Sequence, residues 1–210
     1  VIGHKLKLLV DTGIHGHIHN LEMNLSYIGL NFSDIDLVIV THSHYDHVGN
    51  LAEIKKRSDA NVFAHVDELN FLNDGYTPVP KGTTAFSETI SWISNRFSSS
   101  RIRYNPVNPD FLIDGDCEFV KAPGIKILTT PGHTSGSICV IINDEHAIVG
   151  DTLFNVFTNC LYPPFADNKR SLIGSWEKLL ETKCKNFYPG HGKPIPFAKL
   201  RQCLSKINEP

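Results

Sequence analysis

The chain has 210 residues, of which 41% are apolar and 20% are charged, and its formal net charge is −2. This composition is typical of a folded globular protein and excludes a disordered chain, and the length suits a single domain with one substantial core. A nearly neutral chain offers no Lys/Arg-rich face for phosphates, so we expect no nucleic-acid partner.

Predicted strands and helices alternate in the first third of the chain. Short apolar, β-branched runs indicate strands, and apolar residues spaced three or four apart indicate helices. The order β-α-β-α-β favours a layered α/β architecture. The predicted elements are a strand at 6–10 ending in Asp11-Thr12-Gly13, a helix containing Leu21, Leu25 and Ile28, a strand at 36–40, a helix at 50–57 and a strand at 61–65.

Several polar residues of this region admit two interpretations. His15, His17 and His19 alternate and could bind a metal, but they run into the first helix, so we favour a loop and helix start, with His15 as a possible pocket residue. The triplet Lys55-Lys56-Arg57 fits a solvated helix face better than a binding patch. His65 is interpreted as a hydrogen-bonded structural residue.

The periodic spacing of apolar residues is weaker between residues 66 and 116, where aromatic residues are scattered among prolines and serines. A helical piece is predicted at 84–97. Such a segment could form a lid or substrate pocket, build a dimer contact, or simply cover the core. The sequence leaves these alternatives open.

Regular elements return after this segment, and several strands end at a histidine or an aspartate. Because strand ends at one edge of a sheet converge in space, we expect those side chains to meet. The predicted strands are 125–130, 137–142, 146–150 and 186–188, and the predicted helices are 169–181 and 197–207.

The stretch from Thr41 to Gly49 is the densest group of metal-ligand side chains. His42, His44, Asp46 and His47 follow the strand at 36–40, and imidazole and carboxylate groups are ligands of first-row metals. A polar loop that is merely rich in histidine is the alternative. Together with the strand-end residues, the candidate ligands are His42, His44, Asp46, His47, His133, Asp151 and His191.

These motifs resemble the metallo-β-lactamase superfamily, and within it the glyoxalase II-like metal-dependent hydrolases. The matching stretches run in order from Asp11-Thr12-Gly13 through the histidine motif to His191. The resemblance implies an αββα sandwich, with two mixed β-sheets between outer helix layers. It also implies strands before the one that ends at Asp11, so we expect the first sheet to be short by a strand or more, or its edge to be covered by another chain.

The resemblance further implies a binuclear site in which a metal-bridging hydroxide attacks an ester, thioester, lactone or amide carbonyl. His42, His44 and His133 would hold one metal, Asp46, His47 and His191 the other, and Asp151 would bridge them. Asp46 would also act in catalysis by orienting the hydroxide and passing a proton to the leaving group. Zinc is the metal we expect, with iron or manganese as alternatives, because all three accept these ligands.

Individual residues narrow the subclass. Asp151 disfavours β-lactamases with a cysteine ligand, and His44 disfavours the oxygen-reducing diiron relatives, which carry an acid there. Quorum-quenching lactonases resemble this chain in their ligands but have a tyrosine at the position of Phe154, which disfavours a lactonase. The basic glutathione-binding residues of the glyoxalase II thioesterases are not found before Pro210, which disfavours a glutathione thioester as the substrate. A phosphodiesterase and a non-hydrolytic metal-binding or redox module remain as alternatives.

The remaining expectations concern partners and location. The five cysteines are odd in number and form no C-x-x-C pair, which indicates reduced thiols in a cytoplasmic protein. No apolar run reaches the roughly 20 residues of a membrane helix. We expect a small-molecule substrate, no membrane contact and a possible homodimer.

Overall fold

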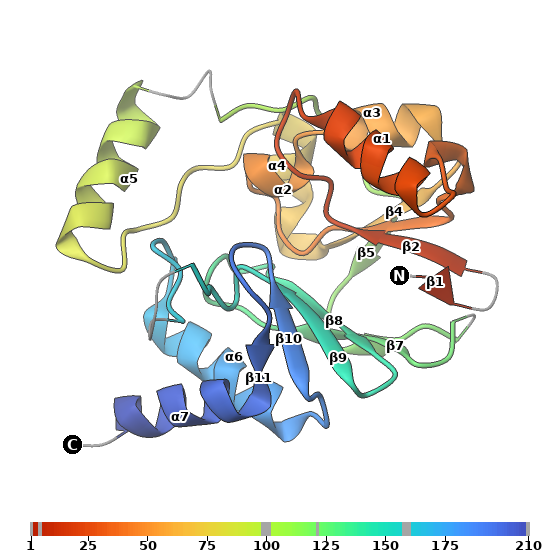
Figure 1. The fold of residues 1–210 in the computed structure, drawn as a ribbon. Coiled ribbons are helices and arrows are strands. Elements are labelled where there is room, and N and C mark those ends of the chain that lie inside the picture. The colour runs from red at the N-terminus through yellow and green to blue at the C-terminus, as the bar shows by residue number, and fades with distance from the viewer. Residues whose placement is uncertain (1, 4–5, 98–101, 121, 157–160, 209–210) are drawn as a thin grey trace. The chain divides into compact units, whose positions relative to one another are not determined.

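The computed structural model describes residues 1–210 except 1, 4–5, 98–101, 121, 157–160 and 209–210 (Figure 1). The chain falls into two compact units. The N-terminal unit comprises residues 1–78 and 95–114, and the C-terminal unit comprises residues 79–94 and 115–210. The expectation of a single domain stays a prediction.

The N-terminal unit contains a five-stranded sheet in the order β1-β2-β3-β4-β5. β2 to β5 run parallel, and β1 is antiparallel to β2. The strands are β1 (Ile2–Gly3), β2 (Leu6–Val10), β3 (Leu37–Ile39), β4 (Asn61–His65) and β5 (Phe111–Ile113). The helices are α1 (Ile18–Tyr27), α2 (Tyr45–Val48), α3 (Leu51–Arg57) and α4 (Leu69–Asp74), with 3-10 turns at Phe32–Asp34 and Val66–Glu68.

The core of this unit explains its layering. β3 is buried along its whole length, as expected for a central parallel strand covered on both faces. Leu51 and Ile54 lie three residues apart on α3, are fully buried and join the same apolar cluster as Val38 and Val62. The 3.6-residue period of the helix and the period of two of the strands thus place their apolar sides together.

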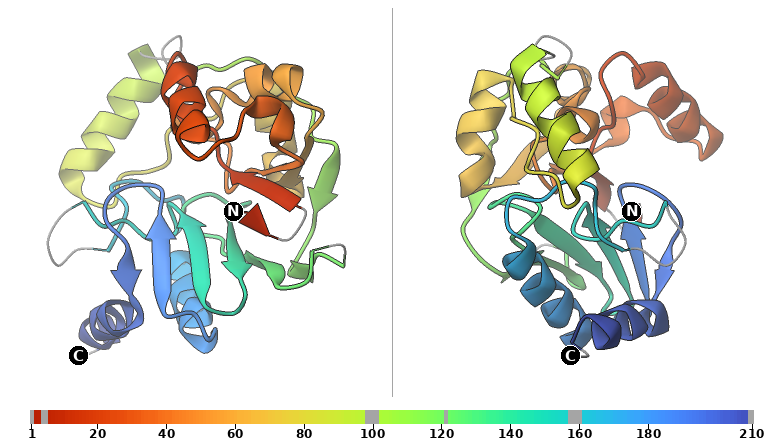
Figure 2. Two further views of the ribbon diagram at one scale, coloured as in Figure 1. Left: turned by 45° about the vertical axis from the view of Figure 1, so that its right-hand side comes forward. Right: turned by 90° about the vertical axis from the view of Figure 1, so that its left-hand side faces the viewer.

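The C-terminal unit contains a six-stranded mixed sheet in the order β11-β10-β9-β8-β7-β6. Its pairs are antiparallel except for β9 and β10, which run parallel. The strands are β6 (Cys117–Glu118), β7 (Ile125–Thr129), β8 (Ile138–Ile142), β9 (His146–Gly150), β10 (Asn186–Pro189) and β11 (Ile195–Pro196). The helices α6 (Lys169–Glu181) and α7 (Phe197–Asn208) lie next to each other against this sheet (Figure 2).

The predicted α/β class with two mixed, helix-flanked sheets is confirmed. The strands β2, β4 and β9 and the helix α6 have the predicted bounds, and most other predicted elements differ by one or two residues. The region 66–116 is more regular than its sequence indicated, because it contains α4, α5 (Ala85–Phe97) and β5. β5 escaped prediction because Phe111 and Leu112 are exposed and its pairing with β4 is set by the tertiary structure.

Two further expectations can be compared with the described residues. Cys117, Cys139 and Cys184 are free thiols, while Cys160 lies outside the described residues. Within the described ranges, none of the helices combines the length and the apolar character that a membrane span requires.

β1 is the described edge of the first sheet, and the expectation of further strands or a covering chain stays a prediction.

Asp110 fastens α3 to the edge of the first sheet. Its carboxylate accepts hydrogen bonds from the Lys55 ammonium and the Val62 backbone N–H, all at 2.8 Å. Burial of the carboxyl group raises its pKa, but these hydrogen bonds outweigh burial, so the pKa of Asp110 lies below its usual value.

We predict that Asp110→Ala lowers the free energy of unfolding by about 1 to 2 kcal/mol at neutral pH, measured by urea denaturation. Since the folded-state pKa is depressed, the stabilisation is complete above the unfolded pKa of about 3.9 and is lost as the pH falls through the folded value. The difference between the proteins should therefore shrink in acid. Asp59→Ala, at an exposed position between α3 and β4, is the control, and a difference independent of pH would contradict the prediction.

Candidate metal centre

The histidine motif lies where β3 ends and α2 begins. His42 and His44 are in the connection, His44 directly precedes the single turn of α2, and Asp46 and His47 are within it. His42, His44 and His47 are only 1%, 7% and 4% exposed. Three imidazoles buried at one strand end are costly unless their nitrogens are satisfied, which argues against a merely polar loop.

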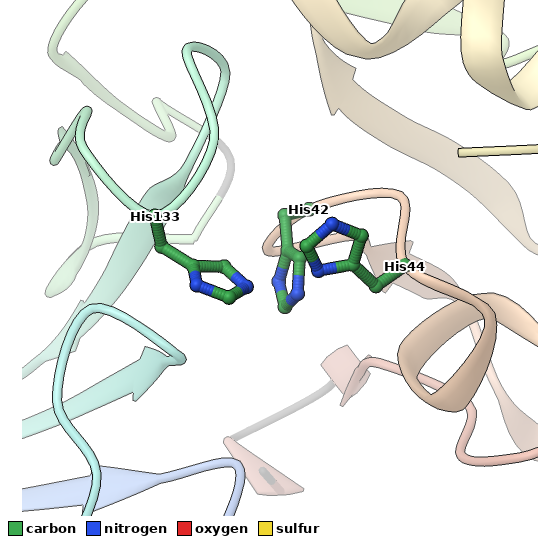
Figure 3. Close-up of side chains that lie close together, drawn as sticks. All are labelled: His42, His44 and His133. Carbon is green, nitrogen blue, oxygen red and sulfur yellow. The ribbon is translucent and has the colours of Figure 1, made fainter. Parts of the chain in front are cut away.

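The rings of this motif converge. The ring centroid of His42 lies 4.6 Å from that of His44, edge to face, and 4.1 Å from that of His47. A ligand atom of Asp46 and one of His47 lie within 4.8 Å of each other. Figure 3 shows the His42 and His44 rings side by side on their loop, and the His133 ring on its own loop of the C-terminal unit.

Asp11 orients two parts of the motif at once. Its Oδ2 accepts from His47 Nδ1 at 2.7 Å and from the Thr41 hydroxyl at 2.7 Å, and its Oδ1 accepts from the Thr41 backbone N–H at 2.8 Å. The Thr41 oxygen in turn lies 3.0 Å from His42 Nδ1. A carboxylate can only accept, so His47 Nδ1 carries the proton and its Nε2 carries the lone pair that a metal needs.

Asp11 has a left-handed backbone conformation, with φ of 57°, which aspartate tolerates better than most residues. The sequence identified Asp11-Thr12-Gly13 as the turn that ends a strand and as the first stretch that resembles the superfamily, but it assigned no role to the carboxylate. The carboxylate's role depends on residues 30 and 36 positions away, so no local pattern reveals it.

Glu68 fixes the backbone between the first two histidines of the motif. This carboxylate is 0% exposed and accepts hydrogen bonds from both the backbone N–H and the hydroxyl of Ser43. The hydroxyl of Thr77 donates to the Ser43 carbonyl at 2.7 Å and lies 2.9 Å from the Tyr104 hydroxyl. Burial raises the pKa of Tyr104 to about 12, so this hydroxyl stays protonated at any physiological pH.

His65 and His15 have structural contacts. His65 Nδ1 accepts from the backbone N–H of Asp67 and caps the following 3-10 turn, which confirms the structural interpretation. His15 Nδ1 lies 3.2 Å from the Gly49 carbonyl oxygen. A side chain at Gly49 would place its Cβ 2.1 Å from the His15 backbone nitrogen, so only glycine permits this close approach after α2.

His133, Asp151 and His191 form a second set in the C-terminal unit. They follow β7, β9 and β10, whose directions place all three carboxyl ends at one edge of the sheet. The Nε2 atoms of His133 and His191 both lie 3.7 Å from Asp151 Oδ2. One carboxylate oxygen thus lies near two imidazole nitrogens, and the three side chains form a group of candidate metal ligands.

The surroundings of this second set orient it. The Phe165 carbonyl lies 2.9 Å from His133 Nδ1 and so receives its N–H, which leaves the lone pair on Nε2. The indole N–H of buried Trp176 donates to the Thr152 carbonyl at 2.6 Å, next to Asp151. The ring of Phe154 lies 5.3 Å from that of His191, where a lactonase-like tyrosine would bring a hydroxyl group.

Both sets therefore have the donor chemistry of a metal site. Because an oxygen holds the Nδ1 atom of His42, His47 and His133, these imidazoles present Nε2 as the ligand atom. Carboxylates complete each set, a combination that suits zinc, iron or manganese. The residues present fit the predicted metals. The single seven-residue centre that would join the two sets stays a prediction.

Known proteins resemble the chain over nearly its whole length. It is 29% identical over 208 residues to the probable metallo-hydrolase MJ0888 of Methanocaldococcus jannaschii, covering 95% of this chain and 91% of the relative. It is 30% identical over 149 residues to the probable metallo-hydrolase YqgX of Bacillus subtilis, covering 70% of this chain and 61% of that one.

A solved structure and a family model agree with these relatives. The metallo-beta-lactamase family protein TTHA1429 from Thermus thermophilus has a similar fold, with a TM-score of 0.70 and 26% identity, covering 99% of this chain and 71% of that one. The model of the metallo-beta-lactamase superfamily matches residues 1–191, which include both sets of ligands. The chain belongs to the metallo-beta-lactamase superfamily.

Proposed function

We propose that this protein is a metal-dependent hydrolase with a binuclear centre, acting on an ester, thioester, lactone or amide carbonyl. The observation that carries the proposal is the pair of ligand sets, each held by its own unit, in which the Nδ1 atoms of His42, His47 and His133 are engaged by oxygen. The relatives named probable metallo-hydrolases support the hydrolase class. In this proposal the two sets act as one centre.

The ligands divide between two cations. His42, His44 and His133 would hold the first, Asp46, His47 and His191 would hold the second, and Asp151 would be a ligand shared by both. Two divalent cations supply Lewis acidity and lower the pKa of water to about 7, so that a nucleophile exists at neutral pH. We propose zinc, and iron or manganese suit the same ligands.

Asp46 has a second role in this proposal. Its half-buried carboxylate lies beside His47 on the one-turn helix α2, which fixes its position through the backbone. It receives the proton of the attacking water and passes it to the leaving group as the carbonyl adduct collapses. A neutral side chain of the same shape would accept a hydrogen bond but could not carry this proton.

Asp11 and Glu68 are positioning residues. Asp11 keeps the proton of His47 on Nδ1, and Glu68 anchors Ser43 between His42 and His44. Hydrogen-bond partners behind metal ligands typically contribute a factor of about 10 to 100 in metal affinity. These two acids therefore tune the site without contacting a substrate.

We predict that the purified protein contains about two metal ions per chain, measured by elemental analysis. His44→Ala and Asp151→Ala should lose metal, and their hydrolysis of p-nitrophenyl acetate should fall by at least about 100-fold, since the activated water is lost. His19→Ala, at an exposed position on α1, is the matched control and should keep both properties. Undiminished hydrolysis by metal-free protein would refute the proposed function.

We predict that Asp11→Asn binds metal about 10- to 100-fold more weakly than the wild type while it remains folded, because the amide cannot replace the carboxylate that orients His47. Competition with a chromophoric chelator measures the affinity, and circular dichroism checks the fold. Asp59→Asn controls for loss of one negative charge. Equal affinity of Asp11→Asn and the wild type would show that Asp11 does not position His47.

A further inference from the structure

The C-terminal unit contains a cavity of about 740 Å³ that the metal-binding residues do not use. It lies between the first part of α5 and the loop that precedes α6, and both segments belong to this unit. The volume is within the range of small-molecule sites, about 300 to 1,000 Å³. Its walls include Phe86, Ile90, Tyr162, Pro164 and Phe165, so the lining is mostly apolar.

The walls are held in place on both sides. The Thr83 backbone N–H donates to the Pro164 carbonyl at 2.9 Å, and the Ala166 N–H donates to the Lys81 carbonyl at 2.8 Å, which fastens the start of the α5 segment to the loop. The Lys169 ammonium donates to the Thr83 carbonyl. Hydrogen bonds thus join the two segments whose side chains line the cavity.

The cavity is also linked to the residues that hold the second ligand set. Phe165 lines the cavity, and its carbonyl receives the N–H of His133. Tyr162 lines it too, and its ring packs at 4.7 Å on Trp176, whose indole N–H holds the Thr152 carbonyl beside Asp151. A ligand in the cavity would therefore lie against the same loop that orients His133.

The exposed side chains at this place point to an apolar ligand. The apolar side chains of Phe86 and Ile90 on α5 are 78% and 38% exposed. Large apolar side chains at the mouth of an apolar cavity gain contacts when an apolar group enters. Lys169 brings a positive charge to the lining, which disfavours a cationic ligand.

We propose that this cavity binds the acyl group of the substrate, and that the substrate is an ester or thioester of an apolar carboxylic acid of medium chain length. The proposal rests on the proposed hydrolase function and adds the class of substrate. It assigns to Phe86, Ile90, Tyr162 and Phe165 a role in specificity, separate from the metal ligands.

We test the proposal with p-nitrophenyl esters from acetate through butyrate and hexanoate to octanoate. For the wild-type protein with its metals, kcat/KM should rise about fourfold per methylene, the fold-change equivalent to ~0.8 kcal/mol per buried CH₂. Ile90→Glu should abolish this rise, so that kcat/KM no longer increases with the length of the acyl chain. Ile93→Glu is the matched control, because Ile93 is 45% exposed on the same helix and does not line the cavity.

A binding measurement makes the test independent of catalysis. Anilinonaphthalene sulfonate should bind the wild type and Ile93→Glu, octanoate should displace it, and Ile90→Glu should bind it at least about tenfold more weakly. No hydrolysis of any ester, with octanoate binding intact, would count against the proposed function and support the cavity. Equal chain-length dependence and equal binding in both variants would refute the acyl site.

Light scattering addresses a competing explanation for the exposed apolar side chains. The proposal expects the two variants to have the same oligomeric state as the wild type. If both variants instead converted a dimer into monomers, this face of α5 would be a subunit contact and the proposal would be wrong.

Discussion

The hydrogen bonds of the Asp11 carboxylate are the constraint on which the histidine motif depends. One oxygen accepts hydrogen bonds from His47 Nδ1 and the Thr41 hydroxyl, and the other accepts one from the Thr41 backbone N–H. Asp11 directly follows β2, and Thr41 follows β3. The carboxylate therefore connects the ends of these two parallel strands to the histidine motif. Its removal would free the imidazole of His47 to adopt the other tautomer, and the ligand atom would change with it.

Buried polar groups elsewhere have the same function of fixing ligands through a second residue. Glu68 would be a costly buried charge if Ser43 did not supply two donors to it. Trp176 occupies the core of the C-terminal unit and still donates to the Thr152 carbonyl beside Asp151. In each unit a buried side chain thus holds the backbone next to a candidate ligand.

Phe165 connects the proposed acyl site to a candidate metal ligand. Its side chain lines the apolar cavity, while its carbonyl oxygen accepts a hydrogen bond from the Nδ1–H of His133. A loop that performs both tasks can change the substrate through its side chains while the backbone continues to hold the metal ligand. In the proposed acyl site, the residues that would determine specificity are therefore distinct from the candidate metal ligands.

The sequence by itself determined the elements and residue types whose cause is local. β4, β9 and α6 were predicted because short apolar runs and the helical period depend on neighbours along the chain, and the seven candidate ligands were found because they follow strands. The tertiary structure decided the roles of Asp11 and Glu68, which contact residues 36 and 25 positions away, and the pairing of the exposed strand β5. Hydrogen bonds across such separations leave no periodic pattern, so only the folded chain reveals them.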